Sequence, residues 1–167
     1  AGVHKLPVIF FCENNRYAIS VSIEKQMGIE SVASRAAGYG FPGVRVDGAD
    51  VVAVHEATKA AVERARAGDG PTLIEASVER LLPHTTDDDH TRYRSTEDIE
   101  QMSKRDPLLI LAELLKRRDL ITESQDEEIH DKAKKRVNVA TDTVDAEAFP
   151  NVDTMFEHVV ENTRGHA

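Results

Sequence analysis

The sequence predicts an α/β fold, in which a parallel sheet with crossover helices is followed by a helical C-terminal tail. Three β-rich runs alternate with helical segments between residues 7 and 78, and the connections between them are short. This alternation is typical of parallel strands joined by crossovers. From residue 95 onward, helix-capping residues precede amphipathic or charged segments. We therefore expect the second part of the chain to be helical.

The strands are expected in three places. Pro7 to Cys12 is a continuous apolar run, which predicts a strand that is buried on both faces. The runs from Val44 to Gly48 and from Thr72 to Val78 predict the second and third strands.

Two helices are expected between these strands. Ser31 is a candidate N-cap for a helix through Ala37, and glycines follow it as stop signals. Asp50 is expected to cap a longer helix that runs to about Ala67 with an apolar face at helical spacing.

The second part of the chain is expected to contain four helices and one linker. Ser95 with Asp98, and Thr122 with Gln125, are capping-box patterns. The predicted segments are a short helix after Ser95, a helix Leu108–Arg118 behind Asp106-Pro107, a charged helix from Thr122 to about Val139, a polar linker over residues 140–150, and a last short helix from Asn151 to Val160.

Composition excludes several classes of function. The 167 residues carry a net charge of −9, from 21 basic and 30 acidic residues, and such a chain repels nucleic-acid phosphates. Cys12 is the one cysteine and is expected to be a small buried hydrophobe, so no intrachain disulfide forms. No run reaches the roughly 18 apolar residues of a membrane span, so no membrane partner is expected.

Asn14 and Asn15 directly follow the first predicted strand. Their side chains offer neutral oxygens to a hard cation and NH2 groups to phosphate oxygens. An Asn-Asn pair is also common in simple turns, so the residue types alone leave both interpretations open.

A second polar loop, residues 83–94, follows the third predicted strand and contains two histidines, three aspartates and two arginines. It has three interpretations: a metal site, a catalytic loop with His84 as acid or base, or a polar loop held by Asp–Arg pairs. The metal site would use His84, Asp87, Asp89 and His90. If the strands are parallel, both polar loops lie at the same edge of the sheet, where ligands bind.

Taken together, the two loops resemble the alpha subunits of thiamin-diphosphate-dependent 2-oxoacid dehydrogenases, in particular the branched-chain type. The stretch from Phe11 to Ser20 resembles the end of that family's cofactor motif, which begins with Gly-Asp-Gly and ends in Asn-Asn. The stretch from His84 to Arg94 resembles its phosphorylation loop. Further matches are Gly38-Tyr39-Gly40, Gly43, Val46-Asp47-Gly48, Gly70-Pro71-Thr72-Leu73, Asp106-Pro107 and Met155-Phe156-Glu157-His158-Val159.

The resemblance implies that Asn15, through its side-chain oxygen, and Tyr17, through its carbonyl, bind the Mg²⁺ that anchors thiamin diphosphate. Ile19 and His84 are implied to bind the cofactor, and His84 is the implied catalytic residue. Thr85 stands where mitochondrial relatives carry a regulated serine. The residues implied to order the loop are Asp88, Asp89, Arg92, Tyr93 and Arg94, the two arginines through pairs with aspartates.

Two departures from the family pattern matter. Many relatives carry Arg or Gln at the position of Glu13, and Gly at the position of Arg16. The acidic side chain of Glu13 argues against its contact with the diphosphate. The 13 residues before Asn14 contain no Gly-Asp-Gly. The resemblance therefore implies a C-terminal portion of the subunit, with an incomplete cofactor site and no activity alone.

By the same resemblance, residues 1–94 are the C-terminal part of the thiamin-diphosphate domain, and residues 95–167 are its helical extension. The implied reaction is oxidative decarboxylation of a branched-chain 2-oxoacid with acyl transfer to lipoyl groups; pyruvate and acetoin enzymes are alternatives. The implied partners are a beta subunit, in an alpha2-beta2 heterotetramer, and a lipoyl-bearing acyltransferase. The expected location is the bacterial cytoplasm or the mitochondrial matrix. The alternative function is that of a truncated, non-catalytic interaction module.

Overall fold

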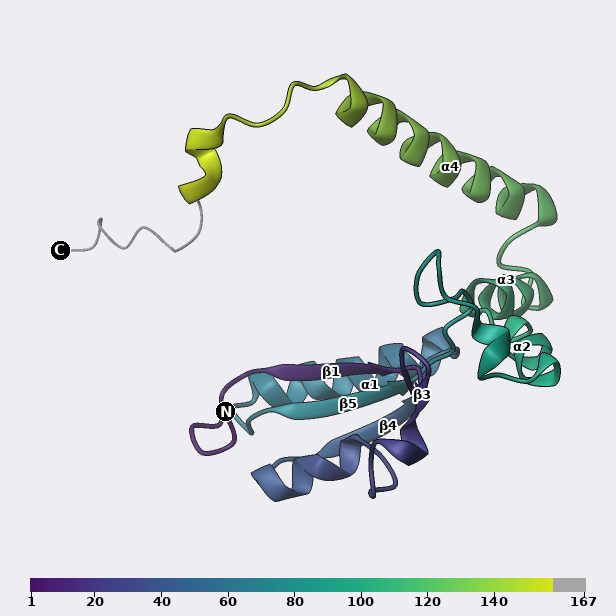
Figure 1. Ribbon diagram of the computed structural model, residues 1–167. Helices are drawn as coiled ribbons and strands as arrows, with labels where there is room; N and C mark the ends of the chain where they lie inside the picture. The colour runs from purple at the N-terminus through teal and green to yellow at the C-terminus, as the bar shows by residue number, and fades with distance from the viewer. Residues whose placement is uncertain (158–167) are drawn as a thin grey trace. The chain divides into compact units, whose positions relative to one another are not determined.

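The chain divides into two compact units, Ala1–Ile121 and Thr122–Ala167, and the computed structural model describes residues 1–157. The first unit contains a parallel sheet of three strands in the order β1-β5-β4, shown in Figure 1. The strands are β1 (Ile9–Asn14), β4 (Gly43–Asp47) and β5 (Thr72–Ser77). The predicted α/β fold with a parallel sheet is confirmed.

All three strands end level with one another. Asn14, the last residue of β1, lies opposite Ser77 of β5, and Ser77 lies opposite Asp47 of β4. The carboxyl ends of the strands therefore form one straight edge. The two polar loops leave the sheet at this edge, as the sequence predicts.

The expected burial of the first strand is wrong for this chain. β1 begins two residues later than predicted and, among residues 1–157, is an edge strand that pairs only with β5. Phe10 and Phe11 point to opposite faces, and each remains more than two-fifths exposed. An apolar run predicts where a strand forms, but it does not show what covers each face.

The segments between the strands differ in kind. Helix α1 (Val51–Arg66) begins as predicted, with the Asp50 carboxylate accepting hydrogen bonds from the backbone of Val52 and Ala53 at 3.0 Å. It packs against the sheet (Figure 1). The other connection is a 3-10 helix, η2 (Ala33–Tyr39), rather than the predicted helix that Ser31 caps.

The position of η2 depends on a close approach to β4. A side chain at Gly43 would collide with the Ala33 carbonyl, so only glycine allows η2 to lie this near the strand. Ser31 accepts a hydrogen bond from the Ser34 backbone at 3.2 Å, although the N-cap position belongs to Val32.

Two helices complete the first unit. Helix α2 (Thr96–Ser103) has the predicted Ser95–Asp98 capping box. Helix α3 (Pro107–Arg117) begins behind Asp106, whose carboxylate accepts from the Leu108 backbone at 2.9 Å. The remaining short elements of this unit are β2 (Tyr17–Ala18), β3 (Val21–Ser22), η1 (Ile23–Lys25) and η3 (His90–Arg92).

The second unit is dominated by α4 (Glu123–Ala146), which starts with the predicted Thr122–Gln125 capping box. The predicted end near Val139 and the linker from residue 140 are wrong, because the helix continues for two more turns. The hydroxyl groups of Thr141 and Thr143 donate to carbonyls one turn back, so these polar residues fit within the helix.

The last described element is η4 (Val152–Phe156), within the helix predicted for Asn151 to Val160. The end of that predicted helix, residues 158–160, lies outside the described part of the chain. It includes His158 and Val159, which belong to the family resemblance. None of the helices among residues 1–157 has the length and apolarity needed to cross a membrane.

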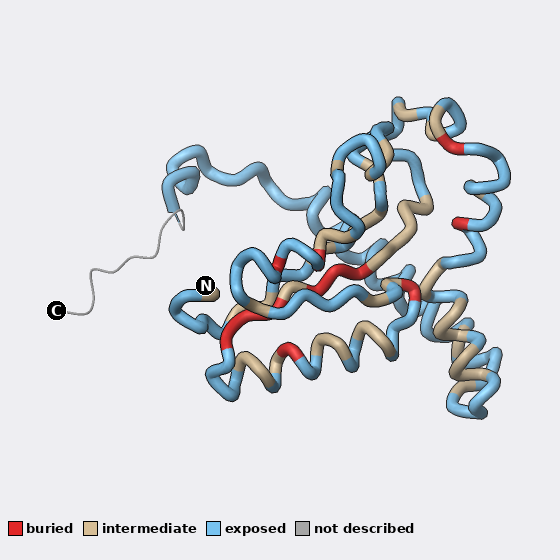
Figure 2. Tube along the Cα trace, turned by 90° about the horizontal axis from the view of Figure 1, so that it is seen from below, coloured by how far each residue is buried: buried red, intermediate tan, exposed pale blue. Residues whose placement is uncertain are grey.

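The core of the first unit is thin and centred on β5. Ile74 is its largest fully buried apolar side chain, and most other buried apolar residues are alanines. Figure 2 shows the buried residues along this central strand in red. Cys12 is half-buried, and burial, followed by the nearby carboxylate of Glu75, raises the pKa of its thiol. The thiol is therefore protonated at neutral pH, as expected of a packing residue.

Glu75 ties three elements together from the centre of the sheet. Its side chain is 1% exposed. One carboxylate oxygen accepts from Asn14 Nδ2 at 2.6 Å, and the other accepts from the Ala33 backbone at 2.9 Å. Burial raises the pKa of Glu75, but the hydrogen bonds from Ala33 and Asn14 outweigh it, so the net pKa is lowered. The buried carboxylate is thus ionised and holds β1 and η2 to β5.

Replacing Glu75 by Gln should destabilise the fold. Each carboxylate oxygen of Glu75 accepts one hydrogen bond, and the amide replaces one of these oxygens by an NH2 group. That NH2 group faces a donor, so one buried hydrogen bond to a charged acceptor is lost. We expect a loss of about 2 kcal/mol in the free energy of unfolding by urea. Glu63→Gln on exposed α1 surface is the control and should change stability by less than about 0.5 kcal/mol. Equal stabilities of the two variants would contradict this role.

Glu75 should also make stability depend on pH in one direction. Because its folded pKa lies below the unfolded value of about 4.3, its contribution is present above that value and is lost as pH falls through the folded pKa. We expect the urea midpoint of the wild-type chain to fall more steeply than that of Glu75→Gln between about pH 5 and about pH 3. Parallel curves would show that another group dominates.

Candidate functional site

The two asparagines of the turn have different roles: the Asn14 side chain is used in hydrogen bonds within the fold, and the Asn15 side chain can still bind a cation. Asn14 uses both of its side-chain groups, since Nδ2 donates to Glu75 and Oδ1 accepts from the Arg16 backbone at 2.9 Å. Asn15 is half-buried, and its Oδ1 accepts from the Tyr17 backbone at 2.9 Å. An amide oxygen has two lone pairs, so the Asn15 oxygen keeps one for a cation.

The turn continues into the β2–β3 hairpin, which the sequence did not predict. Arg16 and Ile19 both have left-handed backbones, with φ of 63° and 57°. For a β-branched residue such as Ile19 this conformation costs about 1–2 kcal/mol and persists only where neighbouring contacts fix it. Arg80 supplies one such contact, because its Nη2 donates to the Ile19 carbonyl at 2.9 Å.

The loop from His84 to Arg94 is held by a network around Asp88. The Tyr93 hydroxyl donates to the Asp88 carboxylate at 2.6 Å and accepts from Arg80 Nη2 at 2.7 Å. The same carboxylate oxygen accepts from the His84 backbone at 2.8 Å and lies 3.9 Å from Arg80 Nη2. The Tyr93 hydroxyl, followed by the His84 backbone N–H, lowers the pKa of Asp88. Burial, followed by the bond to Asp88, raises the pKa of Tyr93.

Arg94 contacts other groups than the aspartate that was expected as its partner, whereas Arg92 helps to lower the pKa of Asp89 through its charge. Arg94 is buried, donates to the Arg80 carbonyl at 3.1 Å and to the sulfur of Met102, and lies 4.3 Å above the ring centre of Tyr17. The guanidinium that pairs with a loop aspartate is instead that of Arg80. Sequence reasoning missed Arg80 because it precedes the loop.

Asp89 has a local role. Its carboxylate caps η3 by accepting from the Thr91 backbone at 3.1 Å and from the Thr91 hydroxyl at 2.6 Å. These bonds lower its pKa, the hydroxyl more than the backbone. Arg92 lies with the three aspartates around a surface hollow of about 400 Å³, which is also lined by Ile19, Ser20 and Tyr93.

The interpretation of the loop as a metal site is wrong. Among residues 1–157, no three His, Cys, Asp or Glu side chains gather as a metal would require, and this includes His84, Asp87, Asp89 and His90. Asp88 and Asp89 are already committed to internal hydrogen bonds. His84 and Thr85, at the start of the loop, are both exposed.

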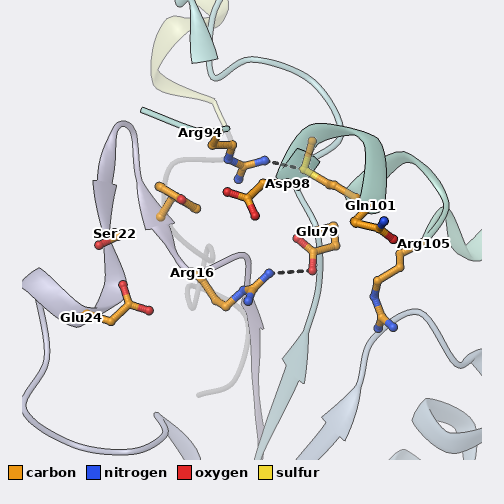
Figure 3. Close-up of a pocket in the computed structure, with 10 residues that line it drawn as sticks. Arg16, Ser22, Glu24, Glu79, Arg94, Asp98, Gln101 and Arg105 are labelled. Atoms are coloured by element: carbon orange, nitrogen blue, oxygen red, sulfur yellow. Dashed lines mark hydrogen bonds and ion pairs between the residues drawn. The ribbon is translucent and has the colours of Figure 1, made fainter. Parts of the chain in front are cut away.

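The two loops, far apart in the sequence, contact each other directly. The rings of Tyr17 and Tyr93 lie 5.8 Å apart, and Arg94 stacks on Tyr17. The adjoining cavity has a volume of about 190 Å³. Figure 3 shows Arg16, Glu79, Arg94 and Arg105 around it. Glu79 and Arg105, like Arg80, were not predicted. The sequence signal that could have found Glu79 and Arg80 is their position just after the carboxyl end of the central strand.

Tyr93→Phe should loosen the loop without unfolding the sheet. The change removes a hydroxyl that makes two hydrogen bonds, to Asp88 and from Arg80. We expect limited proteolysis within residues 84–94 to become roughly five- to tenfold faster, as for the loss of about 1 kcal/mol or slightly more. Tyr39→Phe removes the hydroxyl of an exposed tyrosine on η2 and should leave the rate unchanged. Equal rates in both variants would remove Tyr93 from the loop-ordering network.

Known proteins match this chain along nearly its full length. It is 46% identical over 159 residues to the 2-oxoisovalerate dehydrogenase subunit alpha of Bacillus subtilis, which covers 95% of this chain and 48% of that protein. It is 43% identical over 160 residues to the 3-methyl-2-oxobutanoate dehydrogenase subunit alpha of Mycobacterium tuberculosis, with coverages of 95% and 43%.

A third relative is named for another substrate. The pyruvate dehydrogenase E1 component subunit alpha of Staphylococcus aureus is 39% identical over 163 residues, which are 97% of this chain and 44% of that protein. The chain thus spans about half the length of the curated relatives it matches. The family described as Dehydrogenase E1 component matches residues 1–153. The chain therefore belongs to the Dehydrogenase E1 component family.

Proposed function

We propose that this chain forms part of the alpha subunit of a branched-chain 2-oxoacid dehydrogenase, the decarboxylating component of a multienzyme complex. The observation that carries the proposal is the contact between the Asn15–Tyr17 turn and the His84–Arg94 loop at the carboxyl edge of the sheet. The branched-chain assignment rests on the two relatives at 46% and 43% identity, against 39% for the pyruvate enzyme.

The Dehydrogenase E1 family depends on thiamin diphosphate, and the residues at this edge fit the cofactor in part. The Asn15 side-chain oxygen and the Tyr17 carbonyl are neutral oxygens of the kind that Mg²⁺ accepts beside a diphosphate. Ile19 continues the same turn and would border the cofactor. When bound, thiamin diphosphate supplies the nucleophilic carbon and the electron sink for decarboxylation.

The ligand set in this chain is incomplete. Gly68-Asp69-Gly70 spells the first half of the family motif, but it forms the turn before β5, at the opposite edge of the sheet from Asn15. Other segments must therefore supply the remaining ligands. We propose that the longer alpha subunit and a beta subunit do so, in an alpha2-beta2 assembly, and that the chain alone is inactive.

His84 is the proposed catalytic residue. Its backbone N–H donates to the Asp88 carboxylate, whereas its side chain is exposed at the start of the loop. There the imidazole can hold or deliver a proton while the acyl group passes to a lipoyl group of the partner acyltransferase. Asp88, Tyr93 and Arg94 keep the loop in the shape that presents this ring.

Thr85, the next residue, is the proposed regulatory position. Its hydroxyl is exposed, and its carbonyl accepts from the Asp88 backbone at 3.2 Å. A phosphate there would add a charge of about −2 beside three aspartates, which repel it. Phosphorylation would thus loosen the loop. The proposed location is the cytoplasm for a bacterial enzyme and the mitochondrial matrix for a eukaryotic one.

Asn15→Ala should weaken cofactor binding. The test uses the alpha subunit that contains this sequence, purified with its beta subunit, and measures binding of thiamin diphosphate with Mg²⁺ by calorimetry. Losing one oxygen ligand should raise Kd by about 10- to 100-fold. Asn138→Ala, on the exposed surface of α4, should leave Kd unchanged. The same Kd for both variants would refute the proposed metal role.

A further inference from the structure

Two consecutive residues hold the β2–β3 hairpin at its start and at its tip. Glu79 accepts from Arg16 Nη2 at 2.7 Å, on the side where the chain leaves the Asn15 turn. Arg80 donates to the Ile19 carbonyl at 2.9 Å, at the tip. Both residues stand on the short segment that leads from β5 into the His84–Arg94 loop. Glu79 and Arg80 thus contact the hairpin and lead directly into the loop.

The Arg16–Glu79 pair belongs to a row of charges along the carboxyl edge. Figure 3 shows Arg16 and Glu79 pointing toward each other, with Arg105 on the same cavity. Arg105 donates to the Asp47 carboxylate at 2.6 Å, and this bond, more than the attraction of Glu79, raises its pKa. Glu79 therefore lies between two guanidinium groups, one from each side of the central strand.

The backbone conformation at Arg16 is unusual for an arginine. With φ at 63°, the position favours glycine, and an arginine there is strained. A glycine would fit the turn better but could not reach Glu79. The Arg16 backbone is further fixed by hydrogen bonds to Asn14 and from Ile23, at 2.9 and 2.8 Å.

We propose that Arg16 and Glu79 are positioning residues whose ion pair couples the cofactor-binding turn to the His84–Arg94 loop. Order at either segment then favours order at the other. The cofactor part rests on the proposed function, whereas the coupling between the two segments does not. The side chains of Arg16 and Glu79 are 52% and 16% exposed, so the effect is modest, a factor of about two to five.

The coupling is tested by hydrogen–deuterium exchange of the purified chain without cofactor. Arg16→Gly and Glu79→Gln should each speed exchange at residues 84–94 by about two- to fivefold, and the double variant should add nothing further. Arg16→Lys should restore most of the protection. Glu79→Gln is essential, because it breaks the pair without changing the backbone at residue 16.

Asp119→Gly is the matched control. Asp119 is also a left-handed non-glycine residue, with φ of 54°, but it lies beyond α3 and makes none of the contacts described for the turn. It relieves the same kind of strain and should leave exchange at residues 84–94 unchanged. Wild-type exchange in Arg16→Gly and Glu79→Gln, or simple addition of their effects in the double variant, would overturn the proposal.

The cofactor part is tested in the alpha subunit assembled with its beta subunit. Glu79→Gln should raise the KM for thiamin diphosphate about two- to fivefold while kcat at saturating cofactor stays near wild type. An unchanged KM together with faster loop exchange would support the coupling between the two segments and contradict its link to cofactor binding. If the wild-type assembly binds no thiamin diphosphate, the proposed function fails and the exchange result still stands by itself.

Discussion

The structure depends on one buried carboxylate. Glu75 sits in the middle of the central strand, where its side chain adds hydrogen bonds to the end of β1 and to η2 in a core built largely of alanines. A charge can remain there because donors from both neighbours surround it, and an unpaired charge at the same place would cost several kcal/mol. The hydrogen bond from Asn14 to Glu75 fixes the end of β1, and so fixes where the turn with Asn15 and Tyr17 starts. Fold and candidate site therefore share one anchor.

Features encoded by neighbouring residues could be predicted, and features that depend on distant contacts could not. The caps at Asp50, Ser95, Asp106 and Thr122 involve bonds over two or three residues, so short sequence patterns specify them. The exposure of β1 depends on which strands lie beside it. The polar residues after position 139 remain helical, and the hydroxyl groups of Thr141 and Thr143 donate to carbonyls within the helix, which composition does not reveal.

The same distinction applies to the site. Both loops, and their meeting at one edge, followed from parallel strands and two polar segments. The partners that hold them did not, because Glu79 and Arg80 reach residues more than 60 positions away, at Arg16 and Ile19. Their charges also set the local field. The cavity beside the turn is lined by three arginines and three carboxylates, Arg16, Arg94, Arg105, Glu24, Glu79 and Asp98, so charges of both signs face it.

The strand order has a consequence for how the chain acquires its structure. β1 and β4 do not pair with each other, and each pairs only with β5, which comes last in the sequence. During synthesis, no strand of this sheet has its partner until residues 72–77 have left the ribosome. The β1–β5 pairing then closes a long loop, from Ile9 to Thr72, and such non-local contacts form slowly. Until that moment the apolar run of β1 lacks its β5 partner, and unpaired strand edges of this kind favour aggregation.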